Sequence, residues 1–172
     1  VVEPVSLYGK KNPFPAETLD WVMLNGEGTA KETLHLEFSL VGSGLTYEPG
    51  DALAVQPINA PDVVEAVIQA AKLTGQEKVD VKNVGPKLLA DALREDYDIT
   101  ALSRGVLTKL ADVSGSSVLR DLVGEDKREQ LREWMEGREI IDALLEYAPE
   151  GLPAEALVSI FRKLPVRLYS IA

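Results

Sequence analysis

Arg167-Leu168-Tyr169-Ser170-Ile171-Ala172 is the stretch that carries the most chemical information in this sequence. In a β-strand, residues two apart share a face, so Arg167 and Tyr169 are expected to project together while Ser170 turns to the other side. A guanidinium can grip a pyrophosphate with two parallel charge-assisted hydrogen bonds, and a tyrosine ring suits a flat heteroaromatic group. The alternative is an ordinary core strand with an incidental polar pair, because short motifs are weak signals.

Composition restricts the classes of protein to which the chain can belong. It has 172 residues, of which 45% are hydrophobic and 27% charged, as in soluble globular proteins. One large domain or two small interlocked ones are expected. The net charge of -10 argues against a nucleic-acid partner, and no apolar run reaches the roughly 20 residues of a membrane span. The absence of cysteine excludes disulfides and thiolate metal sites and predicts a cytoplasmic location.

The first third of the chain has the pattern of short β-strands. Strands are predicted at residues 19–24, 31–40 and 52–56. The second of these alternates cleanly, and the residues on its apolar face are Leu34, Leu36, Phe38 and Leu40. Turns rich in Gly and Pro join the strands, including Pro49-Gly50-Asp51, and this organisation is typical of an antiparallel barrel.

At Pro57 the period of the apolar residues changes from two to that of a helix. Asn59 is a plausible cap and Pro61 suits a first helical turn, after which the helical spacing continues to Leu73. Further helices are predicted at residues 86–94, 103–111, 116–122, 126–135, 139–147 and 153–164. The predicted fold class is therefore α+β, with about one hundred helical residues lying between strands.

Two polar features invite a metal or catalytic interpretation. His35 is the only histidine, and without a second histidine or a cysteine a metal site lacks its usual ligands. We expect a structural or hydrogen-bonding role, with a contact at the rim of a cofactor as the alternative. The acidic segment 96–100 lacks the glycine of a tight calcium-binding turn. It is predicted to be a solvated loop that caps the next helix, and no metal site is predicted.

The motif Arg-x-Tyr-Ser resembles the flavin-binding signature of the ferredoxin-NADP reductase superfamily. The order of strands, helical insertion and returning strand resembles the diflavin reductases, most closely the flavoprotein (alpha) component of NADPH-sulfite reductases. Other stretches similar to that family are Tyr8-Gly9-Lys10-Lys11-Asn12-Pro13-Phe14, Thr33-Leu34-His35-Leu36-Glu37, Tyr47-Glu48-Pro49-Gly50-Asp51-Ala52-Leu53 and Asp98-Ile99-Thr100.

The resemblance implies a domain organisation. Residues 1–57 would form a linker and the first strands of a partial antiparallel FAD-binding β-barrel, residues 58–164 an all-α connecting domain, and residues 165–172 the strand that returns to the barrel.

The resemblance also assigns roles to individual residues. Arg167 would bind the FAD pyrophosphate, Tyr169 would stack on the isoalloxazine, and Ser170 would lie near flavin N5, where hydride arrives, as the catalytic residue. Leu168 would contribute backbone and packing. Thr100 is a weaker expected FAD contact, and so is Glu136, whose assignment holds to within a residue or two.

The function implied by the resemblance is that of an NADPH-dependent oxidoreductase. Electrons would pass from NADPH through FAD to FMN and then to an acceptor such as a sulfite reductase hemoprotein, with a cytochrome P450 reductase-like donor as the alternative. The implied partners are a flavodoxin-like FMN domain, an NADPH-binding domain and the hemoprotein. The chain is expected to be part of a longer protein. As an isolated fragment it would be inactive, a cofactor-free helical spacer or docking module.

Overall fold

A computed structural model describes residues 7–9 and 12–171 of the chain. The described chain divides into two compact units. Unit 1 contains the residues up to Gln56 together with those from Arg167, and unit 2 runs from Pro57 to Val166. Three positions in the motifs quoted above, Lys10, Lys11 and Ala172, lie outside the described residues.

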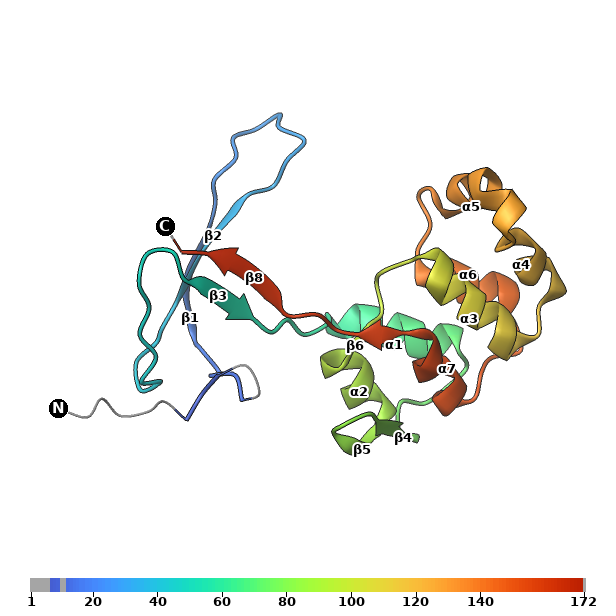
Figure 1. Cartoon of the computed structure of the whole chain (residues 1–172), viewed down its shortest axis with the longest axis horizontal. Helices are drawn as coiled ribbons and strands as arrows, with labels where there is room; N and C mark the ends of the chain where they lie inside the picture. The colour runs from blue at the N-terminus through green and yellow to red at the C-terminus, as the bar shows by residue number, and fades with distance from the viewer. Residues whose placement is uncertain (1–6, 10–11, 172) are drawn as a thin grey trace. The chain divides into compact units, whose positions relative to one another are not determined.

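Unit 1 is built from short antiparallel strands (Figure 1). They are β1 (Thr18–Met23), β2 (Leu34–Phe38), β3 (Ala52–Val55) and β8 (Arg167–Ser170). β1 pairs with β2, and β3 pairs with β8, so the expectation that the final motif lies against the early strands is confirmed. The described strands form two open pairs, and the barrel stays a prediction.

The apolar face of the β1–β2 pair is more exposed than its sequence pattern predicts. Trp21 lies opposite Leu36, and Met23 lies opposite Leu34, which forms an apolar ladder on one face. Leu34 and Leu36 are nevertheless 50% and 48% exposed. The alternation correctly predicted the strand and its apolar face, but this face is exposed, because no second layer covers it within the described residues.

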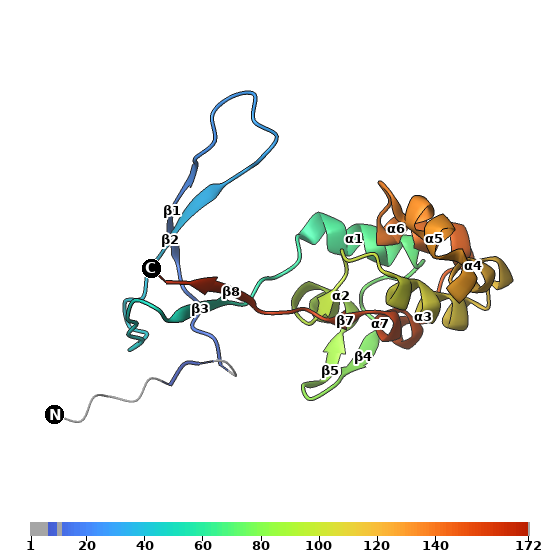
Figure 2. The ribbon, with the colours of Figure 1, turned by 45° about the horizontal axis from the view of Figure 1, so that its top comes forward.

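Unit 2 contains most of the regular structure. Its longer helices are α1 (Pro61–Ala70), α2 (Leu89–Glu95), α3 (Arg104–Ser114), α4 (Ser117–Leu122), α5 (Arg128–Met135), α6 (Ile140–Tyr147) and α7 (Ala154–Ile160). A short 3-10 helix, η1 (Glu125–Lys127), precedes α5. The unit also contains two small antiparallel pairs. One is formed by β4 (Lys78–Val81) and β5 (Gly85–Leu88) (Figure 2). The other is formed by β6 (Tyr97–Asp98) and β7 (Arg162–Lys163).

The prediction that residues 58–164 form an all-α domain is wrong at the β4–β5 hairpin. The helix expected from Pro86 begins only at Leu89. Val79 and Val81 are buried on one face of β4, so the segment satisfies a strand period of two. Asn83 (φ 68°) and Gly85 (φ 103°) adopt the left-handed backbone that a tight connection of this kind requires. The two-residue strands β6 and β7 are a second departure from an all-α unit.

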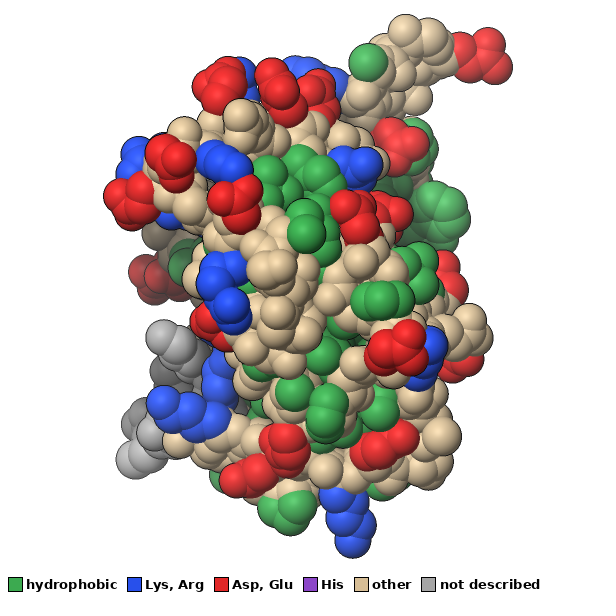
Figure 3. Space-filling model, turned by 90° about the vertical axis from the view of Figure 1, so that its right-hand side faces the viewer, with side chains coloured by type: hydrophobic (Ala, Val, Ile, Leu, Met, Phe, Trp, Pro, Cys, Tyr) green, Lys and Arg blue, Asp and Glu red, His purple; other side chains and the backbone are tan. Residues whose placement is uncertain are grey.

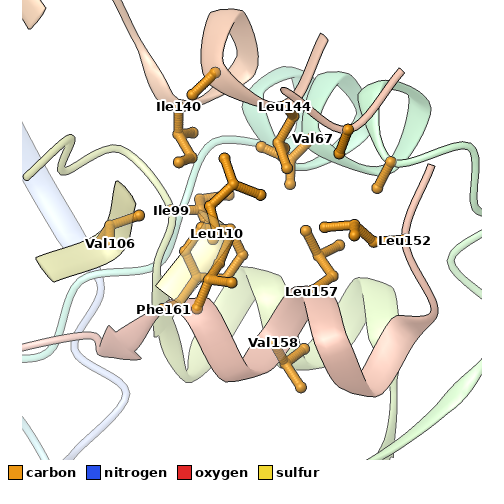
Figure 4. Packing of buried hydrophobic residues seen from close by; sticks show 14 of the residues in the cluster. Val67, Ile99, Val106, Leu110, Ile140, Leu144, Leu152, Leu157, Val158 and Phe161 are labelled. Atoms are coloured by element: carbon orange, nitrogen blue, oxygen red, sulfur yellow. The ribbon is translucent and has the colours of Figure 1, made fainter. Parts of the chain in front are cut away.

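The hydrophobic core lies in unit 2. Among the described residues, every buried hydrophobic side chain falls between Val64 and Phe161. Figure 4 shows the centre of this cluster, where Leu110 and Leu144 converge with Ile99 and Phe161. Completely burying one such side chain stabilises a fold by roughly 1.5–3 kcal/mol relative to leaving it exposed. Unit 2 therefore has its own source of stability.

The sequence predicted Asn59 as the cap of α1, and this prediction is wrong. The N-cap residue is Ala60 and the helix begins with Pro61, which confirms the predicted role of the proline. Asn59 is instead buried, and its Nδ2 donates to the carbonyl oxygens of Leu93 and Tyr97 at 2.6 and 2.7 Å. Its side chain thus ties the segment that precedes α1 to the end of α2 and to β6.

Replacing Asn59 with alanine is expected to destabilise unit 2 by about 2 kcal/mol, because two carbonyl groups lose their shared donor inside the protein. Urea unfolding followed by circular dichroism at 222 nm measures the change, since the helices lie in unit 2. The matched control is Gln69→Ala, which removes an exposed side-chain hydrogen bond to Glu65. Equal stabilities of the Asn59 and Gln69 variants would contradict the assigned role.

Candidate functional site

The candidate site is the face of β8 that carries Arg167 and Tyr169. β8 is held by β3 in an antiparallel register in which Val55 lies opposite Arg167 and Leu53 lies opposite Tyr169. Because side chains alternate along a strand, these residues form one face of the pair. Arg167 and Tyr169 therefore project from the same face of β8, as the sequence predicted.

The turn before β3 continues this pairing beyond the two strands. Gly50 N–H donates to the carbonyl of Ile171, and Ile171 N–H donates to the carbonyl of Asp51, both at 2.8 Å. The Asp51 carboxylate accepts from Glu48 N–H at 2.9 Å and closes the turn. The backbone φ of Gly50 is 99°, a value that residues with a side chain rarely adopt, so this position favours glycine. The Pro49-Gly50-Asp51 turn thus positions the end of the motif.

The Arg167 and Tyr169 side chains are both accessible to a ligand. Tyr169 is 57% exposed, and Arg167 is exposed as well. Within residues 7–9 and 12–171, the Arg167 guanidinium has neither an ion pair nor a side-chain hydrogen bond. An unpaired guanidinium beside an exposed aromatic ring offers one group for an anion and one for a flat ring.

Leu168 and Ser170 lie on the opposite face of β8. Leu168 lies opposite Ala54 and Ser170 lies opposite Ala52, so small side chains flank both. Leu168 is 70% exposed. The strand period therefore separates the Ser170 hydroxyl from the Tyr169 ring, as expected from the sequence.

Thr100, the first candidate in unit 2, is exposed and follows a segment that is buried. The prediction of a solvated acidic loop here is wrong, because Asp98 is only 4% exposed and belongs to β6. The Asp98 carboxylate pairs with the Arg162 guanidinium at 2.8 and 3.0 Å. The next helix, α3, is capped by Ser103 rather than by the acidic segment. Asp98 and Arg162 are 64 residues apart, so local sequence gave no sign of their pairing.

The electrostatics of Asp98 reflect two opposed effects. Burial alone would raise the pKa of its carboxyl group, because it penalises the charged form. Hydrogen bonds from Arg162, Ala101 and Thr100 favour the carboxylate, and the net pKa lies below the ordinary value. Asp98 is consequently ionised at neutral pH and can only accept hydrogen bonds.

Glu136, the second candidate in unit 2, lies between two helices. It caps the C-terminus of α5, and Gly137 follows with a left-handed φ of 69°. The helix α6 begins at a capping box that its N-cap residue Glu139 forms with Asp142. The exposed Glu136 lines an open hollow of about 640 Å³ together with Arg132, Glu133 and Met135.

The aromatic cluster beside this segment fixes its position. The centroids of the Trp134 and Tyr147 rings are 5.4 Å apart, and the Arg138 guanidinium lies 4.7 Å from the centroid of the Trp134 ring. Burial, and next the neighbouring Glu146 carboxylate, raise the pKa of Tyr147 to about 12. Tyr147 is therefore a neutral packing residue at physiological pH.

Other chemical groups of the chain are less suggestive. His35 Nε2 lies 3.1 Å from a Glu37 carboxylate oxygen, in agreement with the predicted hydrogen-bonding role. Among the described residues, no three His, Asp or Glu side chains gather closely enough to hold a metal ion. Each helix within the described ranges is too short or too polar to cross a bilayer. Figure 3 shows a face on which acidic and basic side chains surround hydrophobic patches.

Comparison with known proteins identifies the family to which this chain belongs. Residues 8–172 match the family described as FAD binding domain, and the chain belongs to that family. Its cofactor is accordingly FAD.

The relatives are components of a particular oxidoreductase. The chain is 43% identical to the sulfite reductase [NADPH] flavoprotein alpha-component of Bacillus subtilis over 168 residues, 97% of this chain and 28% of that protein. It is 40% identical to the same component from Aliivibrio fischeri, again over 97% of this chain and 27% of that protein. It is 39% identical to the component from Photobacterium profundum, over 99% of this chain and 27% of that protein. The chain thus spans little more than a quarter of the relatives that it matches.

The side chains on β8 fit FAD. The cofactor presents a pyrophosphate, for which an unpaired guanidinium is a suitable partner, and a flat tricyclic ring, against which an exposed tyrosine can stack. Arg167 and Tyr169 supply these two groups from one face of the strand. In unit 2, Thr100 and Glu136 are both exposed.

Proposed function

We propose that this chain is the FAD-binding and connecting portion of an NADPH-dependent diflavin reductase that delivers electrons to a sulfite reductase hemoprotein. In this proposal unit 1 contributes the start of the FAD-binding barrel and unit 2 is the connecting domain. The observation that carries the proposal is that Arg167 and Tyr169 are both exposed and lie on the same face of β8. The names of the relatives support the choice of acceptor.

The proposed roles of the residues follow their chemistry. Arg167 binds the pyrophosphate, Tyr169 stacks on the isoalloxazine, and Leu168 supplies backbone and packing. FAD, when bound, supplies the chemistry of accepting a hydride and passing on its electrons singly. Thr100 and Glu136 are proposed as two further contacts. Proposed partners are a flavodoxin-like FMN domain, an NADPH-binding domain and the hemoprotein, and the proposed location is cytoplasmic.

The acceptor is tested by mixing the full-length protein with NADPH and either a sulfite reductase hemoprotein or a cytochrome P450. Reduction of the hemoprotein, followed by its haem absorbance and by sulfide formation, is the expected result. Faster reduction of the P450 would instead favour the cytochrome P450 reductase-like alternative.

Ser170 is proposed to assist hydride transfer. Replacing Ser170 with alanine is expected to slow flavin reduction by NADPH about fivefold, with little change in FAD affinity, because a hydrogen bond that strengthens in the transition state is worth about 1 kcal/mol. Stopped-flow absorbance measures the rate, and calorimetric titration measures FAD affinity. Ser170→Thr, which keeps the hydroxyl, is the control. Equal losses in both measurements would contradict a role in the transfer step.

A further inference from the structure

Asp98 forms a junction between two segments of unit 2. One carboxylate oxygen, Oδ1, accepts from Thr100 N–H at 3.4 Å, from the Thr100 hydroxyl at 3.3 Å and from Ala101 N–H at 3.2 Å. The other oxygen, Oδ2, accepts both bonds from the Arg162 guanidinium. A single buried side chain therefore holds the loop that contains Thr100 and the strand β7.

The backbone on both sides of this carboxylate is also held. In the β6–β7 ladder Tyr97 pairs with Lys163 and Asp98 with Arg162, and Leu164 N–H donates to the carbonyl of Asp96 at 2.8 Å. Asn59 adds its bond to the carbonyl of Tyr97 from another direction. Thr100 is therefore the first exposed residue after a segment with little freedom to move.

The direction of the bond between Thr100 and Asp98 follows from charge. An ionised carboxylate has no proton to give, so the Thr100 hydroxyl must be the donor in their contact. A hydroxyl has one proton and two lone pairs. Once its proton is directed to Asp98, Thr100 can offer a ligand only an acceptor, and its partner on the ligand must carry a hydrogen.

We propose that Asp98 is a positioning residue that takes the Thr100 hydroxyl proton and so directs Thr100 to accept a hydrogen bond from a hydroxyl or amino group of FAD, not to donate one to a phosphate oxygen. The inference rests on the proposed function, in which Thr100 is an FAD contact. FAD has suitable donors in its ribityl and ribose hydroxyl groups and in the adenine amino group. Its pyrophosphate oxygens have no hydrogen at neutral pH.

The first experiment measures the FAD dissociation constant of full-length variants by calorimetric titration of the apoprotein. Thr100→Val is close in size to threonine and lacks the hydroxyl, and is expected to weaken binding about five- to tenfold. Asp98→Asn is expected to weaken it by a similar factor, and the double variant by no more than Thr100→Val alone, because both changes remove the same contact. Glu95→Gln, which removes an exposed charge from the ion pair with Lys87, is the matched control.

The outcomes separate the inference from the proposal beneath it. If Thr100→Val binds FAD as tightly as the wild type, Thr100 is no FAD contact, and both fall. If Thr100→Val weakens binding while Asp98→Asn does not, or if the two effects multiply, the contact stands and the positioning role of Asp98 is overturned. Hydrogen exchange at the Thr100 and Ala101 amides provides a readout independent of FAD, and faster exchange is expected in Asp98→Asn.

The second experiment needs no change at Asp98 and holds even if Asp98→Asn fails to fold. Wild-type and Thr100→Val proteins are titrated with FAD analogues that lack, one at a time, a ribityl hydroxyl, a ribose hydroxyl or the adenine amino group. The penalty of Thr100→Val is expected to disappear with the one analogue that lacks the partner of Thr100. If the penalty persists undiminished with every analogue, Thr100 accepts from none of these hydroxyl or amino groups, and the inference is overturned.

Discussion

Replacing Arg167 with alanine in the full-length protein is expected to weaken FAD binding by about a hundredfold to ten-thousandfold. A guanidinium that grips a pyrophosphate makes two charge-assisted hydrogen bonds, each worth roughly 1.5–3 kcal/mol. Every 1.4 kcal/mol corresponds to about a factor of ten in the dissociation constant. Arg167 has no competing partner among the described residues, so the substitution should leave the β3–β8 pair intact. Calorimetric titration of the apoprotein with FAD measures the effect.

Two controls make this prediction specific. Arg167→Lys keeps the charge but loses the planar fork, and an intermediate affinity is expected. Arg128→Ala removes an exposed arginine of α5 and should leave the affinity unchanged. An affinity of Arg167→Ala within threefold of the wild type would exclude the assigned role, since it falls well below the loss of even one charge-assisted bond.

Replacing Arg162 with alanine is expected to destabilise unit 2 by about 3 kcal/mol at pH 7. Removing one partner of a buried pair leaves an uncompensated charge, which costs roughly 3–5 kcal/mol. The lower end applies here, because Asp98 is 4% exposed but the Arg162 side chain is 65% exposed and partly screened by water. Urea unfolding followed at 222 nm measures the loss. Arg132→Ala, at an exposed pair with Glu129, should change stability by less than about 1 kcal/mol.

The pH dependence of this loss has a definite sign. The pKa of Asp98 is lowered in the folded protein, so its contribution to stability is present above the unfolded value, about pH 4, and is lost as the pH falls through the lowered folded value. The gap between the wild type and Arg162→Ala should therefore shrink as the pH falls below about 4. A gap of the same size at pH 7 and pH 3 would show that the ion pair is not its cause.

The parts of the fold that were predicted correctly depend on short-range patterns. The period of two in residues 31–40 defined a strand, and the change of period after Pro57 defined the start of a helical region. The face shared by Arg167 and Tyr169 also follows from local alternation. These features require no knowledge of distant residues.

The parts that were missed depend on long-range contacts or on short segments. β4 is only four residues long, and Pro86, which lies in β5, is a residue type that also favours the first turn of a helix. Local sequence predicts Asn59 as a helix cap, because its actual partners, the carbonyls of Leu93 and Tyr97, lie more than 30 residues away and no local pattern indicates them. The Thr100 and Glu136 assignments rest on resemblance alone, because no periodicity or local motif identifies either residue as a cofactor contact.

The fluorescence of bound FAD tests the central claim, that the Arg167–Tyr169 face of β8 holds the flavin, most directly. A tyrosine ring stacked on the isoalloxazine quenches its emission and adds about 0.5–1.5 kcal/mol beyond area burial. In the full-length protein, Tyr169→Ala is therefore expected to brighten the bound flavin and to weaken its retention. Leu168→Ala, on the opposite face of the same strand, should leave the emission unchanged. Unchanged emission in Tyr169→Ala, or equal brightening in both variants, would contradict the account.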